Sequence, residues 1–104
     1  MKIKIDPLRE NVLTLMRRAG YTFQRAEGVE QAWVRVLGSG GYPRFHIYTK
    51  LEKITLLVNI HLDHKRHTYG EDTRHHAEYE ESAPLTEEIT RLLTAWGESA
   101  TIVK

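Results

Sequence analysis

The sequence predicts a single α+β domain in which two helices pack on one face of an antiparallel sheet of four to five strands. Two segments carry apolar residues at helical spacing, and several shorter segments alternate apolar and polar residues at strand spacing. Glycines separate most of these segments, as expected of turns. Since 104 residues is an ordinary length for one domain, we expect residues 1–104 to share one core.

The first part of the chain predicts a strand and then a helix. Residues 1–5 alternate apolar and charged side chains, as a short strand does. Asp6 is the expected cap of the following helix, with Pro7 at its first position and Gly20 at its end. One apolar face follows from the helical spacing of Leu8, Val12, Leu15, Met16 and Ala19.

The middle of the chain predicts four strands, at residues 21–25, 31–37, 44–51 and 54–63. If residues 52–53 form a two-residue turn, the last two strands make a hairpin in which Phe45 faces Ile60. One side of this hairpin is then apolar and packs against the helices, while the other is polar and open. The residues expected on the apolar side are Phe45, Ile47, Leu51, Ile54, Val58 and Ile60.

The last third begins with residues 64–83, which show no regular period and are expected to form a long loop. A second helix follows, with Ser82 or Thr86 as its cap and Gly97 as its end. Its apolar face comprises Leu85, Ile89, Leu92, Leu93 and Trp96. Residues 100–103 predict a further edge strand.

The composition excludes several classes of function. Without cysteine the chain has no disulfide, no thiolate zinc site and no cysteine nucleophile. Its apolar runs are too short to span a membrane, and the N-terminus lacks the apolar segment of a signal peptide. We therefore expect a cytoplasmic protein with no membrane partner.

Charge is unevenly distributed along the chain, and this asymmetry suggests an anionic partner. Residues 1–66 hold twelve Lys and Arg against six Asp and Glu, whereas residues 67–104 hold three against eight. If Trp33 shares the polar face of the sheet, that face combines stacking groups with cations, which suits single-stranded RNA. The residues expected to bind nucleic acid are Arg35, Arg44, His46, Tyr48, Lys50, Lys65 and Arg66.

Histidine clustering supports an alternative function, a divalent-metal site and a hydrolase built on it. Five of the six histidines lie between residues 61 and 76, and imidazole is a frequent ligand of zinc. The expected ligands are His61, Asp63, His75, His76 and Glu78. No residue pattern identifies an activated nucleophile, so the sequence leaves open whether the protein is an enzyme.

A third interpretation is a protein-interaction module that forms homo-oligomers. In this interpretation the acidic C-terminal part of one copy meets the basic face of another. The sequence equally allows a simpler arrangement, in which the acidic part folds onto the basic part of its own chain and neutralises it.

Two resemblances to known families add to these expectations. Residues 15–25 (LMRRAGYTFQR), with a turn glycine at 28 and three strands, resemble the N-terminal part of HicA-type toxins. Those are small RNA-cleaving proteins with a double-stranded-RNA-binding-like fold. Their catalytic histidine follows the turn glycine, where this chain has residues 29–31 (VEQ), so the resemblance implies the fold alone. Residues 40–46 (GGYPRFH), 61–65 (HLDHK) and 75–79 (HHAEY) resemble small uncharacterised bacterial proteins, which imply no activity.

Overall fold

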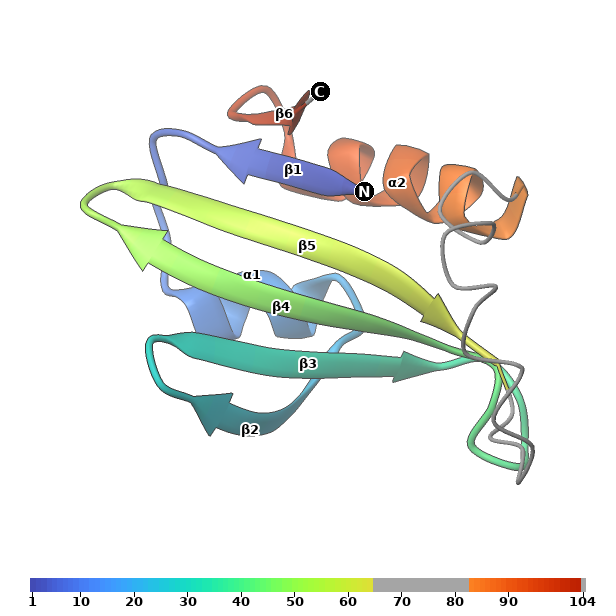
Figure 1. Cartoon of the computed structure of the whole chain (residues 1–104). Coiled ribbons are helices and arrows are strands. Elements are labelled where there is room, and N and C mark those ends of the chain that lie inside the picture. The colour runs from blue at the N-terminus through green and yellow to red at the C-terminus, as the bar shows by residue number, and fades with distance from the viewer. Residues whose placement is uncertain (65–82, 104) are drawn as a thin grey trace.

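Six antiparallel strands and two helices make up the structure, a computed structural model that describes residues 1–64 and 83–103 (Figure 1). The elements are β1 (Lys2–Ile5), α1 (Val12–Arg18), β2 (Thr22–Glu27), β3 (Glu30–Val36), β4 (Arg44–Glu52), β5 (Thr55–Asp63), α2 (Ala83–Trp96) and β6 (Ala100–Val103). Across the sheet their order is β2-β3-β4-β5-β1-β6. The α+β class is confirmed, and the sheet has more strands than the four to five expected because β1 and β6 both join it.

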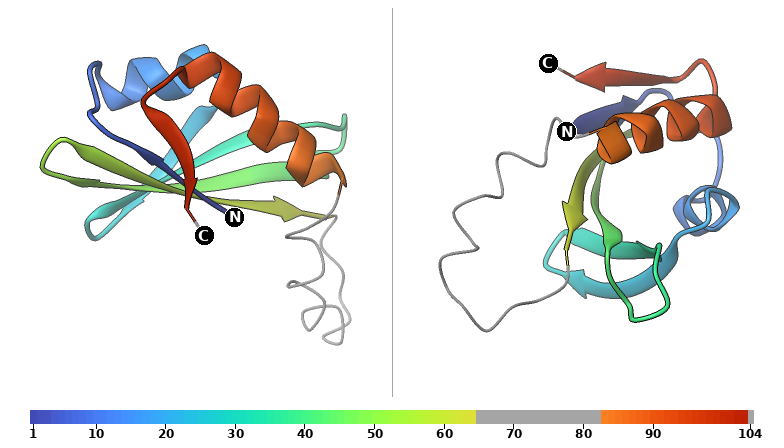
Figure 2. Two further views of the ribbon diagram at one scale, coloured as in Figure 1. Left: turned by 90° about the horizontal axis from the view of Figure 1, so that it is seen from above. Right: turned by 90° about the vertical axis from the view of Figure 1, so that its right-hand side faces the viewer.

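Both helices lie on the same side of the sheet, as predicted, and the sheet curls around them (Figure 2). β1 is placed between β5 and β6, so both ends of the chain are part of the sheet. Apolar side chains from the inner face of the sheet and from both helices form one cluster. Its largest fully buried members are Trp33, Tyr21, Ile3, Met16, Ile47, Leu56, Ile60, Leu85 and Leu92.

β4 and β5 form the predicted hairpin, but their register differs by two residues. Phe45 lies opposite Leu62, where Ile60 was expected. The turn residues are 53–54, because Lys53 takes the positive φ of 58° that a two-residue hairpin turn needs. Since side chains alternate with a period of two, a shift by two leaves every side chain on its predicted face.

The register shift moves two predicted core residues out of the core. Leu51 is 51% exposed and Ile54 is 60% exposed. Ile54 lies in the turn itself, and Leu51 is close to the tip of the hairpin. Their places are taken by Leu56 and Leu62, which the longer pairing buries.

Helix α1 begins later than predicted. Asn11 caps it instead of Asp6, and its side-chain oxygen accepts hydrogen bonds from two N–H groups of the first turn at 2.8 and 3.3 Å. The N–H groups of Asp6 and Leu8 donate to carbonyls of Ser99 and Ile54. Because these donors bond to carbonyls of other segments, residues 6–10 stay outside the helix. The helix stops at Gly20 as expected, with a φ of 94°.

β3 does not present Trp33 or Arg35 to the polar face, which the RNA-binding interpretation supposed. Trp33 lies opposite Ile47 and Arg35 opposite Phe45, so both point to the helix-covered face of the sheet. Trp33 is buried, and its indole N–H donates to the Thr49 hydroxyl at 3.0 Å. Neither residue is available to the polar face of the sheet.

Candidate functional site

The face of the sheet that α1 and α2 leave uncovered is the candidate site, and we call it the open face. Every second residue of β4 lies on it as predicted: Arg44, His46, Tyr48 and Lys50. Directly opposite on β5 are Asp63, His61, Asn59 and Leu57. Beyond β5, the register adds Lys2 and Lys4 from β1.

Three rings stand next to one another at the centre of the open face. The rings of Tyr48 and His46 have centroids 4.6 Å apart and are tilted by 37°. His61, across the hairpin, meets Tyr48 edge-on with centroids 6.4 Å apart. Tyr48 and His61 are half-buried, so they present part of their surface for contact.

Among the described residues, Asp63 at the end of β5 is the only acidic residue beside these three rings. Its Oδ2 lies 3.3 Å from His46 Nδ1 and 3.7 Å from Arg44 Nε. Burial opposes ionisation of the carboxyl group, but the hydrogen bond from His46 and the charges of His46, Arg44 and His61 outweigh it. The pKa of Asp63 is therefore lowered, and the carboxylate form is favoured.

Most cations of the outer open face have acidic neighbours. Lys50 Nζ lies 3.1 Å from Glu52, and the Arg25 guanidinium pairs with Glu27. Lys2 and Lys4 are different, since they are exposed and form no ion pair within residues 1–64 and 83–103. Their ammonium groups are the cations most readily offered to a ligand on this face.

Arg35 has a structural role that the sequence analysis missed, because its partner Glu88 lies on the apolar side of α2. The Glu88 carboxylate accepts hydrogen bonds from Arg35 at 3.2 Å, from the Tyr21 hydroxyl at 2.6 Å and from Arg91 at 2.8 Å. Burial and the hydrogen bond to Glu88 raise the pKa of Tyr21. These groups satisfy one another beneath α2, so Arg35 lies with Glu88 on the helix-covered face and not on the open face. The available signal was the Glu88–Arg91 spacing of three on a helix.

The predicted metal ligands are only partly within the described chain. His61 and Asp63 share the open face, next to His46. Within residues 1–64 and 83–103, no three His, Cys, Asp or Glu side chains are grouped so that they could hold a metal ion. His75, His76 and Glu78 lie outside the described residues, as do the predicted nucleic-acid contacts Lys65 and Arg66.

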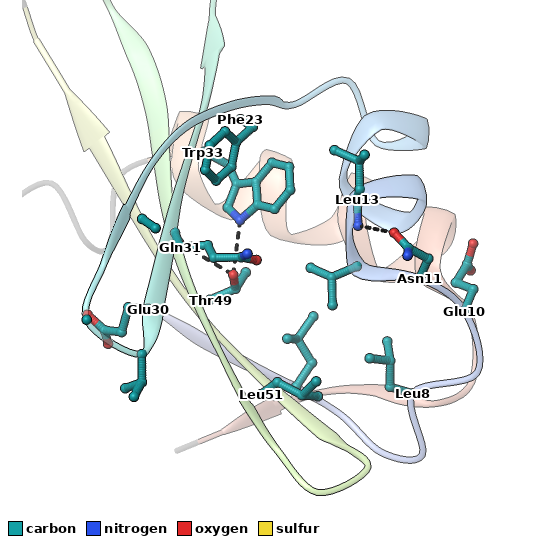
Figure 3. A pocket seen from close by; sticks show the side chains of 15 residues that line it. Leu8, Glu10, Asn11, Leu13, Phe23, Glu30, Gln31, Trp33, Thr49 and Leu51 are labelled. Atoms are coloured by element: carbon teal, nitrogen blue, oxygen red, sulfur yellow. Dashed lines mark hydrogen bonds between the residues drawn. The ribbon is translucent and has the colours of Figure 1, made fainter.

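An apolar groove on the opposite side of the sheet was not predicted. It lies between α1 and the strands β2 to β5 and has a volume of about 810 Å³ (Figure 3). Large apolar side chains that line it and remain exposed are Leu13, Phe23, Val29 and Leu51. The ring of Phe23 meets Trp33 edge-on at 5.3 Å and forms one wall.

Comparisons of the chain with protein-family models, curated protein sequences and solved structures found no match. The resemblances to HicA-type toxins and to small bacterial proteins therefore stay predictions from the sequence. Among the described residues, no helix is long and apolar enough to cross a membrane.

Proposed function

We propose that this protein binds single-stranded RNA on the open face of its sheet. The observation that carries the proposal is the position of Tyr48 on that face, where its ring contacts the rings of both His46 and His61. Lysine and arginine side chains surround these rings on β1, β2 and β4. Stacking groups among cations are what a single strand requires, because bases stack on rings while phosphates need positive charge.

The ion pairs of this face do not prevent phosphate binding. Arg25 and Lys50 pair with Glu27 and Glu52 close to solvent. Exposed pairs of this kind are worth about 0–1 kcal/mol, so a phosphate can compete for the cation. Lys2 and Lys4 have no ion pair among the described residues, so a phosphate can bind them without displacing a carboxylate. Each base stacked on an aromatic side chain typically adds about 1–3 kcal/mol.

The experiment measures the affinity for a fluorescein-labelled oligouridylate of eight nucleotides by anisotropy at several salt concentrations. Tyr48→Ala should weaken binding about tenfold, the loss of one stacked base. Phe23→Ala is the matched control, because Phe23 is an exposed ring on the other side of the sheet.

Salt dependence provides the second measurement. Log affinity should fall linearly with log salt, and the slope should decrease by about 0.7 for each of Lys2→Ala and Lys4→Ala that removes a phosphate contact. Absence of binding at 20 mM salt, or equal affinities for wild type and Tyr48→Ala, would contradict the proposal.

The apolar groove supports a second candidate function, a protein-interaction module that self-associates. Leu13, Phe23 and Leu51 expose apolar surface toward one concavity, and such surfaces mark interaction sites when they are contiguous. Sedimentation velocity at increasing concentrations should then show a dimer that Phe23→Ser together with Leu51→Ser abolishes. A monomer at every concentration would exclude self-association through the groove.

A further inference from the structure

We propose that β6 is the contact surface for a second copy of this chain, and that two copies join their β6 strands edge to edge about a two-fold axis. The proposal goes beyond the proposed function and does not depend on RNA binding. β6 is an edge strand, and among residues 1–64 and 83–103 no strand other than β1 pairs with it. In Figure 1 β6 is the uppermost element, and neither helix extends past it.

The hydrogen bonds of the β1–β6 ladder show which backbone groups of β6 point outward. The N–H of Asp6 donates to the carbonyl of Ser99 at 3.0 Å, so these two residues form a bonded pair that continues the ladder. Bonded and non-bonded pairs alternate between antiparallel strands, and Ile102 and Ile3 therefore form a non-bonded pair. The carbonyl of Met1, two residues before Ile3, accepts from β5, which gives the same alternation from the other side of β1. The N–H and C=O of Ile102 consequently point to the outer edge of the sheet.

The side chain of Ile102 lies at the border of the core. It projects to the same face as Ile3, the face that the helices cover, yet it is 42% exposed whereas Ile3 is fully buried. The difference arises because β1 has a strand on each side and β6 has a strand on one side only among the described residues. A further strand beside β6 would bury this apolar surface.

The two edges of the sheet differ in their protection against such pairing. On β2 the register is irregular between Phe23 and Arg25, and Arg25 pairs with Glu27. Bulges and charges are devices by which edge strands avoid pairing with other chains. β6 pairs with β1 in regular register, and its sequence ATIV contains no charged residue and no proline.

A second copy of β6 fits this edge because the edge is self-complementary. Two antiparallel β6 strands can be centred on Ile102, so that its N–H and C=O bond to the C=O and N–H of the same residue in the other copy. The two Ile102 side chains then become direct cross-strand neighbours on the helix-covered face. One two-fold axis perpendicular to the sheet therefore satisfies both the backbone and the side chain.

The charges of the neighbouring strand do not oppose this contact. The charged residues of β1 are Lys2 and Lys4, and three strand spacings, about 14 Å, would separate them from their equivalents in the other copy. This separation exceeds the Debye length of about 10 Å at 0.1 M salt, so the repulsion is largely screened. The same axis places the open faces of both copies on one side of a continuous sheet.

The contact is small, since each copy contributes one strand of four residues. Stable complexes bury about 1,200–2,000 Å² in total, more than such a strand pair provides. We therefore expect a weak dimer in exchange with the monomer, populated as the concentration of the full chain rises from about 10 µM to 1 mM.

Sedimentation velocity over this range should show a mean mass that rises toward that of two chains. Hydrogen exchange followed by NMR locates the contact. The amide of Ile102 should become protected as the dimer fraction rises, whereas that of Thr101, which points to β1, should be protected at every concentration.

Two variants assign the dimer to this edge. Ile102→Pro removes the outward N–H, at an edge position where a strand tolerates proline, and Ile102→Lys places a charge at the centre of the contact. Each should leave a monomer at all concentrations, with folding checked by circular dichroism. Phe23→Ser together with Leu51→Ser is the matched control, because these residues line the apolar groove and should leave the dimer unchanged.

Three results would overturn the proposal. One is a monomer at every concentration of wild type. Another is an Ile102 amide that exchanges at the same rate in monomer and dimer. The third is a dimer that persists in both Ile102 variants, and its loss in the groove double variant would then assign self-association to the groove.

Discussion

Replacement of Glu88 by Ala should destabilise the protein strongly, because this carboxylate is buried beneath α2 and holds three partners. The Glu88 side chain is 2% exposed and accepts hydrogen bonds from Tyr21, Arg35 and Arg91. Removing it leaves the Tyr21 hydroxyl buried without its acceptor, at a cost of about 1–3 kcal/mol. Arg35 and Arg91 are partly exposed, so water compensates part of their loss. We expect a total near 3 kcal/mol, at the lower end of the losses measured when one partner of a buried ion pair is removed.

Urea unfolding followed by circular dichroism measures this loss directly. In a domain of this size, 3 kcal/mol corresponds to a decrease in Tm of roughly 10–20 °C. Glu87→Ala is the matched control, because Glu87 is the exposed neighbour on the same helix and should change stability by less than about 0.5 kcal/mol. If the two variants unfold at the same urea concentration, the Glu88 carboxylate is solvated and the buried network does not exist.

Three further predictions test the two faces of the sheet and its histidines. Ile47→Ala should cost on the order of 1–4 kcal/mol in urea unfolding, whereas Asn59→Ala on the open face should cost less than about 1 kcal/mol, and equal losses would mean that both faces are buried. The pKa of Asp63 in the folded protein lies below its ordinary value of 3.8. The ionised carboxylate therefore contributes fully to the free energy of unfolding above about pH 3.8, and this contribution disappears as the pH falls through the folded pKa. Asp63→Asn should therefore make the unfolding free energy depend less on pH below about pH 4. If wild type and Asp63→Asn lose stability equally over this range, the pKa of Asp63 is not lowered. If residues 61–78 form a zinc site, equimolar zinc should raise the Tm of wild type but not of His61→Ala, and identical melting with and without zinc would exclude it.

The sequence was sufficient to predict which side of the β4–β5 hairpin is buried. Ile47 and Val58 are both in the core, although the register differs from the predicted one by two residues. Alternation constrains faces with a period of two and does not distinguish registers that differ by two. The conformation of Lys53 selects between them, and positive φ at a lysine has no clear signal in the sequence.

The sequence could not assign the sides of β3, because both of its alternating sets contain apolar residues. Ala32, Val34 and Val36 form one set, and Trp33 shares the other with Arg35. The choice depends on tertiary partners: Thr49 accepts from Trp33, and Glu88 accepts from Arg35. An arginine on a buried face is stable only when such a carboxylate is present, and Glu88 lies far away in sequence.

The ion pairs of the described residues show which carboxylates the basic part of the chain meets. Within the described residues, only Arg35 among the cations of residues 1–64 pairs with a carboxylate of the C-terminal part. Four further cations pair with carboxylates of their own part: Arg18 with Glu10, Arg25 with Glu27, Arg44 with Asp63 and Lys50 with Glu52. Among the described residues, Lys2 and Lys4 of the open face take part in none of these ion pairs. In the proposed function, the phosphates of an RNA strand therefore lie over β1 while its bases reach across β5 to Tyr48 on β4.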